Sequence, residues 1–414
     1  MRQAAEQGRP GAPGRAARLL STVTLLLACQ GCMGPVAVDT EESAPPFSFR
    51  SLDLQQRTKD GLPSWTLKSP EARYNIRSSV ARALRPEGVI FARGKPLYRL
   101  AATTGTVVND GAVILLEGSI RLQRLGDDPL LVLADRAVWI PSDALMRFDR
   151  FPEVRDKRHR LTSETALLRL DRDWLELRGK PRLERWSRSI HLTDTPPPGL
   201  LEIVGTVKTL DWQPGKGTLL GEGPVTIRRR PPRSAAKAPP QVLTASRLEG
   251  NTLQQRYTLQ GPVGIDDPAE RSWFRGGSLT FDTKDQWLTS AAAFQAQRGA
   301  LRLRGEALRL DGKQTSASIE RDCQLDQHGD GLQARRCQWN WITQAVQAEG
   351  DVLFRRGDNR QLTRAERIEG QLGSQGGVKA TTPGGRVITQ LRMPPQKTSP
   401  ARSRVPAKPE PIVF

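Results

Sequence analysis

The stretch Gly118–Gln123, which reads GSIRLQ, decides the fold that we expect for this chain. After the glycine, the apolar residues Ile120 and Leu122 alternate with polar ones. Alternation with a period of two is typical of a β-strand that has one apolar and one polar face. The stretch therefore predicts a strand in an antiparallel sheet whose outer face is in water.

The same alternation recurs along the chain. Further pairs of apolar residues two positions apart are Leu168 and Leu170, Leu175 and Leu177, Val225 and Ile227, Leu301 and Leu303, and Val352 and Phe354. No long amphipathic pattern at helical spacing occurs beyond the N-terminal region. We therefore predict an all-β fold.

A loose repeat underlies these strands. One half of the repeat is a glycine followed by a short strand, at Gly118-Ser119-Ile120, Gly179-Lys180-Pro181, Gly223-Pro224-Val225, Gly261-Pro262-Val263 and Gly350-Asp351-Val352. The other half is a small residue followed by charged or polar ones, at Ala134-Asp135-Arg136, Ala245-Ser246-Arg247, Gly305-Glu306-Ala307 and Ala365-Glu366-Arg367. Units of roughly 30 to 40 residues hold about two strands and bury their apolar face only by stacking. The repeat predicts an elongated, solenoid-like sheet, and unrelated hairpins in ordinary sandwiches are the alternative.

The N-terminus has the features of a secretion signal. Residues 1–28 begin with basic residues and continue into an apolar run that ends before Cys29. This run is shorter than the roughly 20 apolar residues of a membrane span. Its Leu-Leu-Ala-Cys ending resembles the lipobox of bacterial lipoproteins, which implies cleavage before Cys29 and acylation of that residue. Ordinary signal cleavage and a buried cysteine are alternatives, and Cys32 is a rival acceptor in a poorer context.

The composition fits an exported, turn-rich protein. The chain has 414 residues, with 37 Gly and 31 Pro, a low apolar content of 37% and a net charge of +19. An excess of Lys and Arg suits anionic lipid headgroups, acidic glycans or nucleic acid, and it also serves solubility alone. Because export argues against nucleic acid, we predict no nucleic-acid partner.

The chain divides into five parts. We expect a signal peptide at 1–28, a flexible tether at 29–46, β-regions at 47–195 and 196–392, and a disordered tail at 393–414. Two proline-rich stretches interrupt the strands. They are Pro196–Pro198 and the basic segment Arg228–Pro240, which is either a long loop or a linker between halves.

Cys323 and Cys337 are the two cysteines outside the leader region. In an oxidising compartment we expect them to form a disulfide. They flank the turn signal His328–Gly331, so a hairpin there is expected to place them across from each other. A metal site is the alternative, although it would need more ligands than these and His328.

Nothing in the sequence indicates catalysis. The histidines His159, His191 and His328 lie far apart and in no recognisable motif, and no Gly-x-Ser-x-Gly or His-Glu-x-x-His is present. A phosphate-binding loop is also missing, so energy for any transport must come from a partner. We predict no enzyme activity, no metal and no cofactor.

Two local patterns resemble known families. The segment Gly350–Phe354 followed by Ala365–Gly370 resembles the OstA-like repeat of lipopolysaccharide-export bridge proteins, a pattern that extends over most of residues 110–392. The region 47–140 resembles the LptC family, the periplasmic component attached to the lipopolysaccharide-export ABC transporter. The residues that carry this second resemblance are Phe49–Leu52, Gly61–Leu67, Ala72–Tyr74, Tyr98–Ala102 and Gly118–Leu122.

The resemblance implies a twisted, folded-over antiparallel sheet, a β-jellyroll or β-taco, with an open apolar groove that holds acyl chains. The groove candidates are Ile120, Leu122, Leu168, Leu170, Leu175, Leu177, Val225, Ile227, Leu301, Leu303, Val352 and Phe354. A closed core formed by these same residues is the alternative. The implied partners are lipopolysaccharide, the ABC transporter, other OstA-like bridge proteins joined by strand-edge pairing, and the membrane through the lipid anchor.

The implied location is the periplasm, with the anchor in the inner membrane rather than the outer one. The chain departs from typical LptC proteins, which carry a transmembrane helix and one short domain. It looks like a long lipoprotein variant of the kind expected in cyanobacteria-like bacteria. Two other functions remain open: a structural envelope lipoprotein that binds anionic polymers through its basic surface, and a carbohydrate-active enzyme on a β-solenoid.

Overall fold

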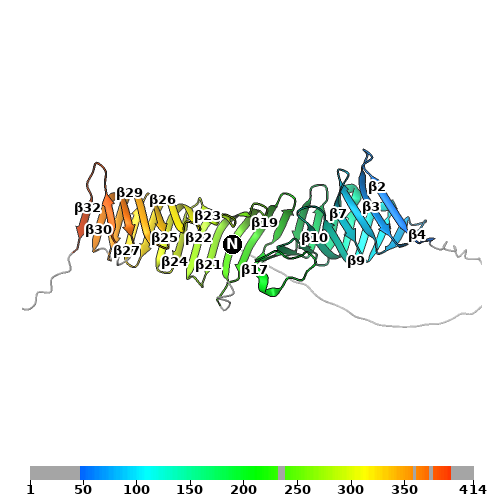
Figure 1. Ribbon diagram of the computed structural model, residues 1–414, viewed down its shortest axis with the longest axis horizontal. Coiled ribbons are helices and arrows are strands. Elements are labelled where there is room, and N and C mark those ends of the chain that lie inside the picture. Colours follow the sequence, from blue (N-terminus) through cyan, green and yellow to red (C-terminus); the bar gives the residue numbers. More distant parts are fainter. Residues whose placement is uncertain (1–46, 232–237, 358–359, 373–375, 393–414) are drawn as a thin grey trace, which may run out of the picture. The chain divides into compact units, whose positions relative to one another are not determined.

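The computed structural model describes residues 47–231, 238–357, 360–372 and 376–392. These residues belong to one compact unit that begins at Pro46. They form a single antiparallel sheet with three short 3-10 turns, η1 (Asn109–Gly111), η2 (Pro141–Asp143) and η3 (Pro198–Leu200). The predicted all-β, folded antiparallel sheet is confirmed (Figure 1). The signal peptide with Cys29 and Cys32, the tether and the tail lie outside the described residues.

The strands of the first half are β1 (Phe47–Phe49), β2 (Leu52–Arg57), β3 (Pro63–Ser69), β4 (Glu71–Asn75), β5 (Val80–Leu84), β6 (Glu87–Ala92), β7 (Lys95–Ala101), β8 (Thr104–Val108), β9 (Val113–Arg124), β10 (Leu130–Ile140), β11 (Leu145–Asp149), β12 (Glu153–Arg155), β13 (His159–Thr162), β14 (Thr165–Arg169), β15 (Trp174–Arg178) and β16 (Arg182–Trp186).

The strands of the second half are β17 (Leu201–Thr206), β18 (Thr209–Gln213), β19 (Thr218–Arg229), β20 (Gln241–Asn251), β21 (Arg256–Asp267), β22 (Ser272–Asp282), β23 (Trp287–Ser290), β24 (Phe294–Arg298), β25 (Leu301–Asp311), β26 (Ser316–Gln327), β27 (Asp330–Ala334), β28 (Arg336–Asn340), β29 (Ala345–Arg356), β30 (Gln361–Gln371), β31 (Val378–Thr381) and β32 (Ile388–Leu391).

Each pass of the chain across the sheet is divided by a bend. Long strands such as β9 and β10 cross the bend in one piece with a shift of register, whereas shorter strands such as β15 and β16 form one pass between them. The segments on one side of the bend pair with one another, for example β5 with β8 and β8 with the first half of β9. The segments on the other side pair separately, for example β6 with β7 and β7 with the second half of β9. We call these two sides the first arm and the second arm.

The predicted glycine repeat lies at this bend. Gly118, Gly179, Gly223, Gly261 and Gly350 all have positive φ, between 73° and 92°. A residue with a side chain rarely adopts this conformation. A Cβ atom on Gly261 would also lie 2.7 Å from the Cβ of Ser246 on the neighbouring strand. Glycine is therefore needed here both for the backbone angle and for the close approach of adjacent passes.

The second half of the predicted repeat lies opposite the first. Ala134 pairs with Ile120, Ala245 with Val225, and Ala365 with Val352. The two sequence patterns thus lie on adjacent strands and pair with each other across the same bulge. A β-bulge adds a residue to one strand and increases its local twist, which here folds the sheet over.

Turns connect successive passes at the free margin of each arm. On the first arm, the side-chain oxygens of Asn251, Asp282, Asp311 and Asn340 each accept hydrogen bonds from the backbone N–H groups two and three residues later. Such Asx turns are a local property of Asn and Asp side chains. We call the two rows of turns the lips, and the gap between them the seam.

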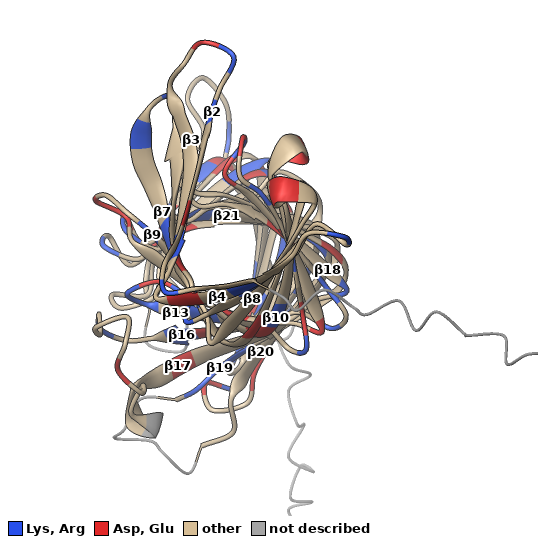
Figure 2. Cartoon of the chain, turned by 90° about the vertical axis from the view of Figure 1, so that its right-hand side faces the viewer, with Lys and Arg blue, Asp and Glu red and all other residues tan. Residues whose placement is uncertain are grey.

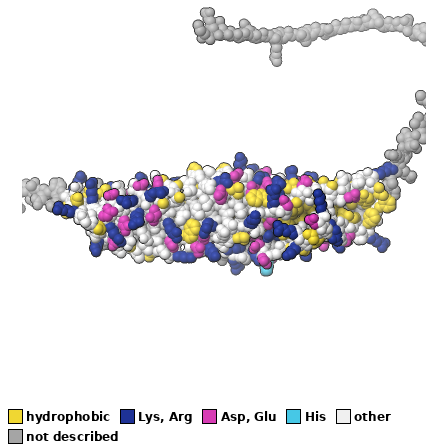
Figure 3. Space-filling model, turned by 90° about the horizontal axis from the view of Figure 1, so that it is seen from above, with side chains coloured by type: hydrophobic (Ala, Val, Ile, Leu, Met, Phe, Trp, Pro, Cys, Tyr) yellow, Lys and Arg dark blue, Asp and Glu magenta, His cyan; other side chains and the backbone are white. Residues whose placement is uncertain are grey.

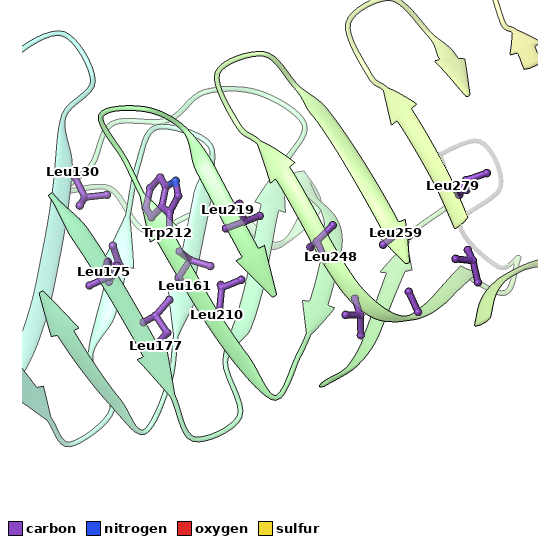
Figure 4. Packing of buried hydrophobic residues seen from close by; sticks show 14 of the residues in the cluster. Leu130, Leu161, Leu175, Leu177, Leu210, Trp212, Leu219, Leu248, Leu259 and Leu279 are labelled. Atoms are coloured by element: carbon purple, nitrogen blue, oxygen red, sulfur yellow. The ribbon is translucent and has the colours of Figure 1, made fainter. Parts of the chain in front are cut away.

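The core fills the space between the arms. Figure 2 looks along the stack of strands and shows the backbone of the sheet wrapping around a central axis. The buried apolar side chains form one continuous cluster. Ile120, Leu122, Leu175 and Leu177 have no exposed surface, and each such burial contributes about 1.5–3 kcal/mol. Figure 4 shows part of this cluster between the front and rear strands.

Cys323 and Cys337 form a disulfide, with a Cα–Cα distance of 5.9 Å. The hairpin between β26 and β27 is present, but the cysteines are not opposite each other as expected. Cys323 pairs with Ala334 and Cys337 pairs with Ile319, because the chain turns through the bend between Ala334 and Cys337. The disulfide therefore joins the second arm to the first arm next to the bend.

The two proline-rich stretches are loops of the second lip. Arg229 pairs with Gln241, so the basic segment connects the adjacent strands β19 and β20, and the alternative of a linker between halves is wrong. The loop that contains Pro196 connects β16 to β17, which also pair with each other. Strand pairing is therefore continuous across the predicted boundary between residues 195 and 196, because β16 and β17 lie on either side of it. The division of the chain into two β-regions stays a prediction.

We predict that Gly261→Ala lowers the free energy of unfolding by about 2–3 kcal/mol, through the strained backbone angle and the contact with Ser246. Gly126→Ala is the matched control, because Gly126 also has positive φ but open space around it. The control should cost about 1 kcal/mol. Urea unfolding of the full chain measures both, and equal losses would contradict the role of close approach at the bend.

We predict that reduction of the disulfide lowers the free energy of unfolding by about 3 kcal/mol in the loop-entropy model. Urea unfolding with and without dithiothreitol measures the change. A variant with both cysteines replaced by serine should unfold as the reduced protein does and should not respond to reductant. Identical midpoints for oxidised and reduced wild-type protein would show that the bond adds no stability.

Candidate functional site

An apolar cavity of about 600 Å³ lies between the two arms in the middle of the sheet. The first arm contributes Trp212, Leu219, Leu248, Tyr257, Leu279, Phe281 and Leu288 to its wall. The second arm contributes Leu161, Leu183, Ile203, Ile227, Leu243 and Ile265. Several of these side chains are only half-buried, so the cavity is open to solvent along the seam.

The register of the second arm brings part of the cavity wall together. Leu183, Gly205, Ile227, Leu243 and Ile265 are successive cross-strand partners in one row. The four side chains of this row line the cavity, and all four are only half-buried. The row is therefore an apolar wall that stays partly open to solvent.

Two aromatic rings form part of the first arm's wall. Tyr257 and Phe281 stack with their ring centroids 5.4 Å apart. Tyr257 lies against Gly250, where any side chain would collide with its ring. Burial raises the pKa of the Tyr257 hydroxyl, and the charges of Arg185, Asp156 and Arg158 on the opposite arm also act on it. Tyr257 therefore faces across the seam toward charged residues of the second lip.

The second lip is charged where it borders the cavity. His159 Nδ1 lies 2.9 Å from a carboxylate oxygen of Asp156, and Arg229 lies 3.6 Å from Glu202. Arg185 also lines the cavity, and no carboxylate of the described residues forms an ion pair with it. The facing residues of the first lip, Thr252, Thr283 and Gln286, are uncharged. The cavity thus has an apolar wall, and its second lip carries Arg185, a cation without a carboxylate partner among the described residues.

On its N-terminal side the seam is closed. Trp65 of the second arm meets Trp139 of the first arm edge-on, with ring centroids 5.3 Å apart. Further along, the hydroxyl of Tyr98 donates a hydrogen bond to Asp173 on the opposite lip. Burial and the Asp173 carboxylate raise the pKa of Tyr98 well above its usual value, so the hydroxyl keeps its proton.

The predicted groove residues occupy two kinds of position. Of the twelve candidates, all except Ile227 are buried, with at most 7% of their surface exposed. Ile227 is half-buried and lines the cavity. The structure thus places all twelve in or against one apolar interior, and their contact with acyl chains stays a prediction.

Other cavity residues were not among the candidates. Leu183, Ile203, Leu243, Tyr257 and Ile265 all line it. Ile265 continues the alternation that begins at Val263, so the period-two signal extends to it. Tyr257 likewise lies two residues before Leu259, so the same signal extends to it. Leu183 stands apart from such pairs, and only the pairing of strands brings it to the cavity.

Within the described ranges, no cluster of three or more His, Cys, Asp and Glu side chains is arranged to hold a metal ion. None of the described helical segments has the length and apolar character needed to span a membrane.

Residues 17–177 match the family described as lipopolysaccharide-assembly, LptC-related. This part of the chain is therefore similar to LptC-related proteins. The resemblance predicted from residues 47–140 is confirmed, and the match indicates a periplasmic protein of lipopolysaccharide transport. The LptC-related part includes the closed portion of the seam, whereas most of the cavity lies beyond its end.

Comparison with solved structures finds similarity to the LptA-homologous protein LptH, described as a periplasmic component of the conserved lipopolysaccharide transport device from Pseudomonas aeruginosa. The sequence identity is 16% and the TM-score is 0.19, over 39% of this chain and 80% of that chain. No curated protein matches the chain.

Proposed function

We propose that this protein is a lipid-anchored, non-enzymatic component of the lipopolysaccharide transport bridge. It binds acyl chains in the apolar cavity between the arms and passes the cargo toward the outer membrane. The observation that supports this most is an apolar cavity open along a seam, in a chain whose N-terminal part is LptC-related.

The cavity suits acyl chains on energetic grounds. Transfer of a methylene group from water to an apolar wall contributes about 0.8 kcal/mol, so ten methylenes contribute on the order of 8 kcal/mol before ordering costs. No specific polar contact is needed for such binding. Because all acyl chains share this chemistry, the wall favours the binding of any acyl chain and does not distinguish one lipid from another.

The polar part of the cargo stays at the seam. Sugars and phosphates remain hydrated there, and Arg185 is the nearest cation without a carboxylate partner. Charge-assisted hydrogen bonds from arginine to phosphate are stronger than neutral ones. Elsewhere on the visible face, basic and acidic side chains are interspersed rather than gathered into one basic patch (Figure 3). This favours recognition at the seam over general binding of anionic polymers.

The two ends of the sheet suit edge pairing with other bridge proteins. At the first end, β1 pairs only with β4 and β2 only with β3 among the described residues. At the other end, β31 and β32 both pair with β30. Exposed apolar side chains lie at both ends, including Phe47 and Leu391. An extended partner strand at either edge would continue the sheet through backbone hydrogen bonds.

The lipid anchor at Cys29 would hold the N-terminal end of the chain at the inner membrane. The ABC transporter is the proposed source of energy, since the chain carries no phosphate-binding loop. The same transporter would deliver lipopolysaccharide to the cavity. Bridge proteins paired to the strand edges would continue the apolar path toward the outer membrane.

We predict that a photo-crosslinking amino acid at Leu243 captures purified lipopolysaccharide. The matched control is Thr244, the next residue, which is exposed on the outer face. Mass spectrometry of the adduct identifies the lipid. Equal capture from both positions, or capture from Thr244 alone, would contradict the proposed site. Retention of an anionic polymer without any lipid adduct would favour the envelope-scaffold alternative instead.

We predict that Arg185→Gln weakens binding of phosphorylated lipopolysaccharide roughly tenfold, the loss expected for one hydrogen bond to a charged group. Binding of the dephosphorylated lipid should change little. Arg188→Gln is the control, since Arg188 is an exposed arginine of the same lip that does not line the cavity. Fluorescence titration with both lipids measures the difference, and an equal loss for both would argue against phosphate recognition by Arg185.

A further inference from the structure

A polar cluster joins the two lips at the N-terminal end of the cavity. The Tyr98 hydroxyl donates a hydrogen bond to Asp173, and Arg124 Nε lies 3.3 Å from the other carboxylate oxygen of Asp173. The backbone N–H of Gly215 donates to that same oxygen over 2.9 Å. Tyr98 and Arg124 belong to the second arm, whereas Asp173 and Gly215 belong to turns of the first arm.

This cluster differs from the other charged contacts of the lips beside the cavity. The pairs His159–Asp156 and Arg229–Glu202 each join residues of one arm, so they leave the seam free to open. The Tyr98 side chain is fully buried, and the Arg124 and Asp173 side chains are only 16% and 17% exposed. A charge that is buried and then loses its partner carries a large desolvation cost. The cluster therefore resists separation of the arms at this point.

The position of the cluster relates it directly to the cavity. Gly215 lies in the turn between β18 and β19, and the residues that flank this turn, Trp212 and Leu219, line the cavity. On the N-terminal side of the cluster, Leu67 on β3 and Leu116 on the first half of β9 are completely buried. The cluster thus separates an open, partly empty interior from a closed, filled one.

We propose that Tyr98, Arg124 and Asp173 form a latch that confines bound acyl chains to the cavity. The interior on the N-terminal side, within the LptC-related part, accepts acyl chains only when this latch opens. Cargo therefore reaches the cavity laterally through the seam while the latch is closed. This inference rests on the proposed function, because it concerns where along the same interior the cargo is held.

The test maps lipid contacts without changing the packing. Photo-leucine replaces leucine throughout the full-length protein, lipopolysaccharide is added and illuminated, and crosslinked peptides are identified by mass spectrometry. In the wild-type protein we expect adducts at Leu183 and Leu243 and few at Leu67 and Leu116. In the variant Tyr98→Phe with Asp173→Asn, adducts at Leu67 and Leu116 should rise roughly tenfold, as expected when a charged hydrogen bond is lost.

Tyr74→Phe is the matched control, because it removes a tyrosine hydroxyl of the first arm that forms no hydrogen bond across the seam with any described residue. Tyr98→Phe alone removes a single oxygen and serves if the double variant does not fold. Strong labelling of Leu67 and Leu116 in the wild-type protein would overturn the latch, as would an unchanged pattern in folded latch variants. Absence of adducts at Leu183 and Leu243 in every protein would instead overturn the proposed function.

Discussion

Each pass of the chain turns through the same bend, and that bend constrains the rest of the structure. A flat sheet of this length would leave an apolar face in water, at a cost of about 25 cal/mol for each Å². The bend folds the sheet over so that the two halves of that face meet. It depends on left-handed backbone at Gly118, Gly179, Gly223, Gly261 and Gly350, where glycine removes both the strain and the collision with the preceding pass.

The bend also creates the seam and the cavity, the two features on which the proposed function depends. Because the bend closes one side of the fold, the turns of the two arms face each other on the other side. Where large side chains such as Trp65, Trp139 and Tyr98 reach across, the arms meet and the seam is closed. Further along, Ile227, Leu243 and Ile265 of the second arm and Tyr257 and Phe281 of the first arm are only half-buried and line the cavity. The inward side chains thus meet across one part of the interior and leave space in another.

The polar groups follow the same division. Near the N-terminus they hold the arms together through Asp173, which receives hydrogen bonds from both arms. Beside the cavity they stay within one lip and leave Arg185 without an acidic partner. The disulfide between Cys323 and Cys337 strengthens the bend on the C-terminal side and leaves the lips unconstrained there. A protein that must hold an amphipathic cargo benefits from this arrangement. Because the bend holds the two arms together, the lips beside the cavity need few contacts with each other.

Local sequence was sufficient to predict the strands, the repeat, the hairpin at His328 and the family resemblance. These features depend on alternation and on glycine at positive φ, which act over a few residues. The family resemblance implied that the sheet folds over, but the alternation alone did not show that the two halves of the repeat, on adjacent strands such as β9 and β10, pair across one bulge at the bend. The position of the disulfide was missed for the same reason. The cavity also required the tertiary structure, because Leu243, Tyr257 and Leu183 meet only through pairing between distant strands. Local pattern therefore determined which side chains point inward, and the stacking of the two arms decided which of them pack against one another and which leave a space.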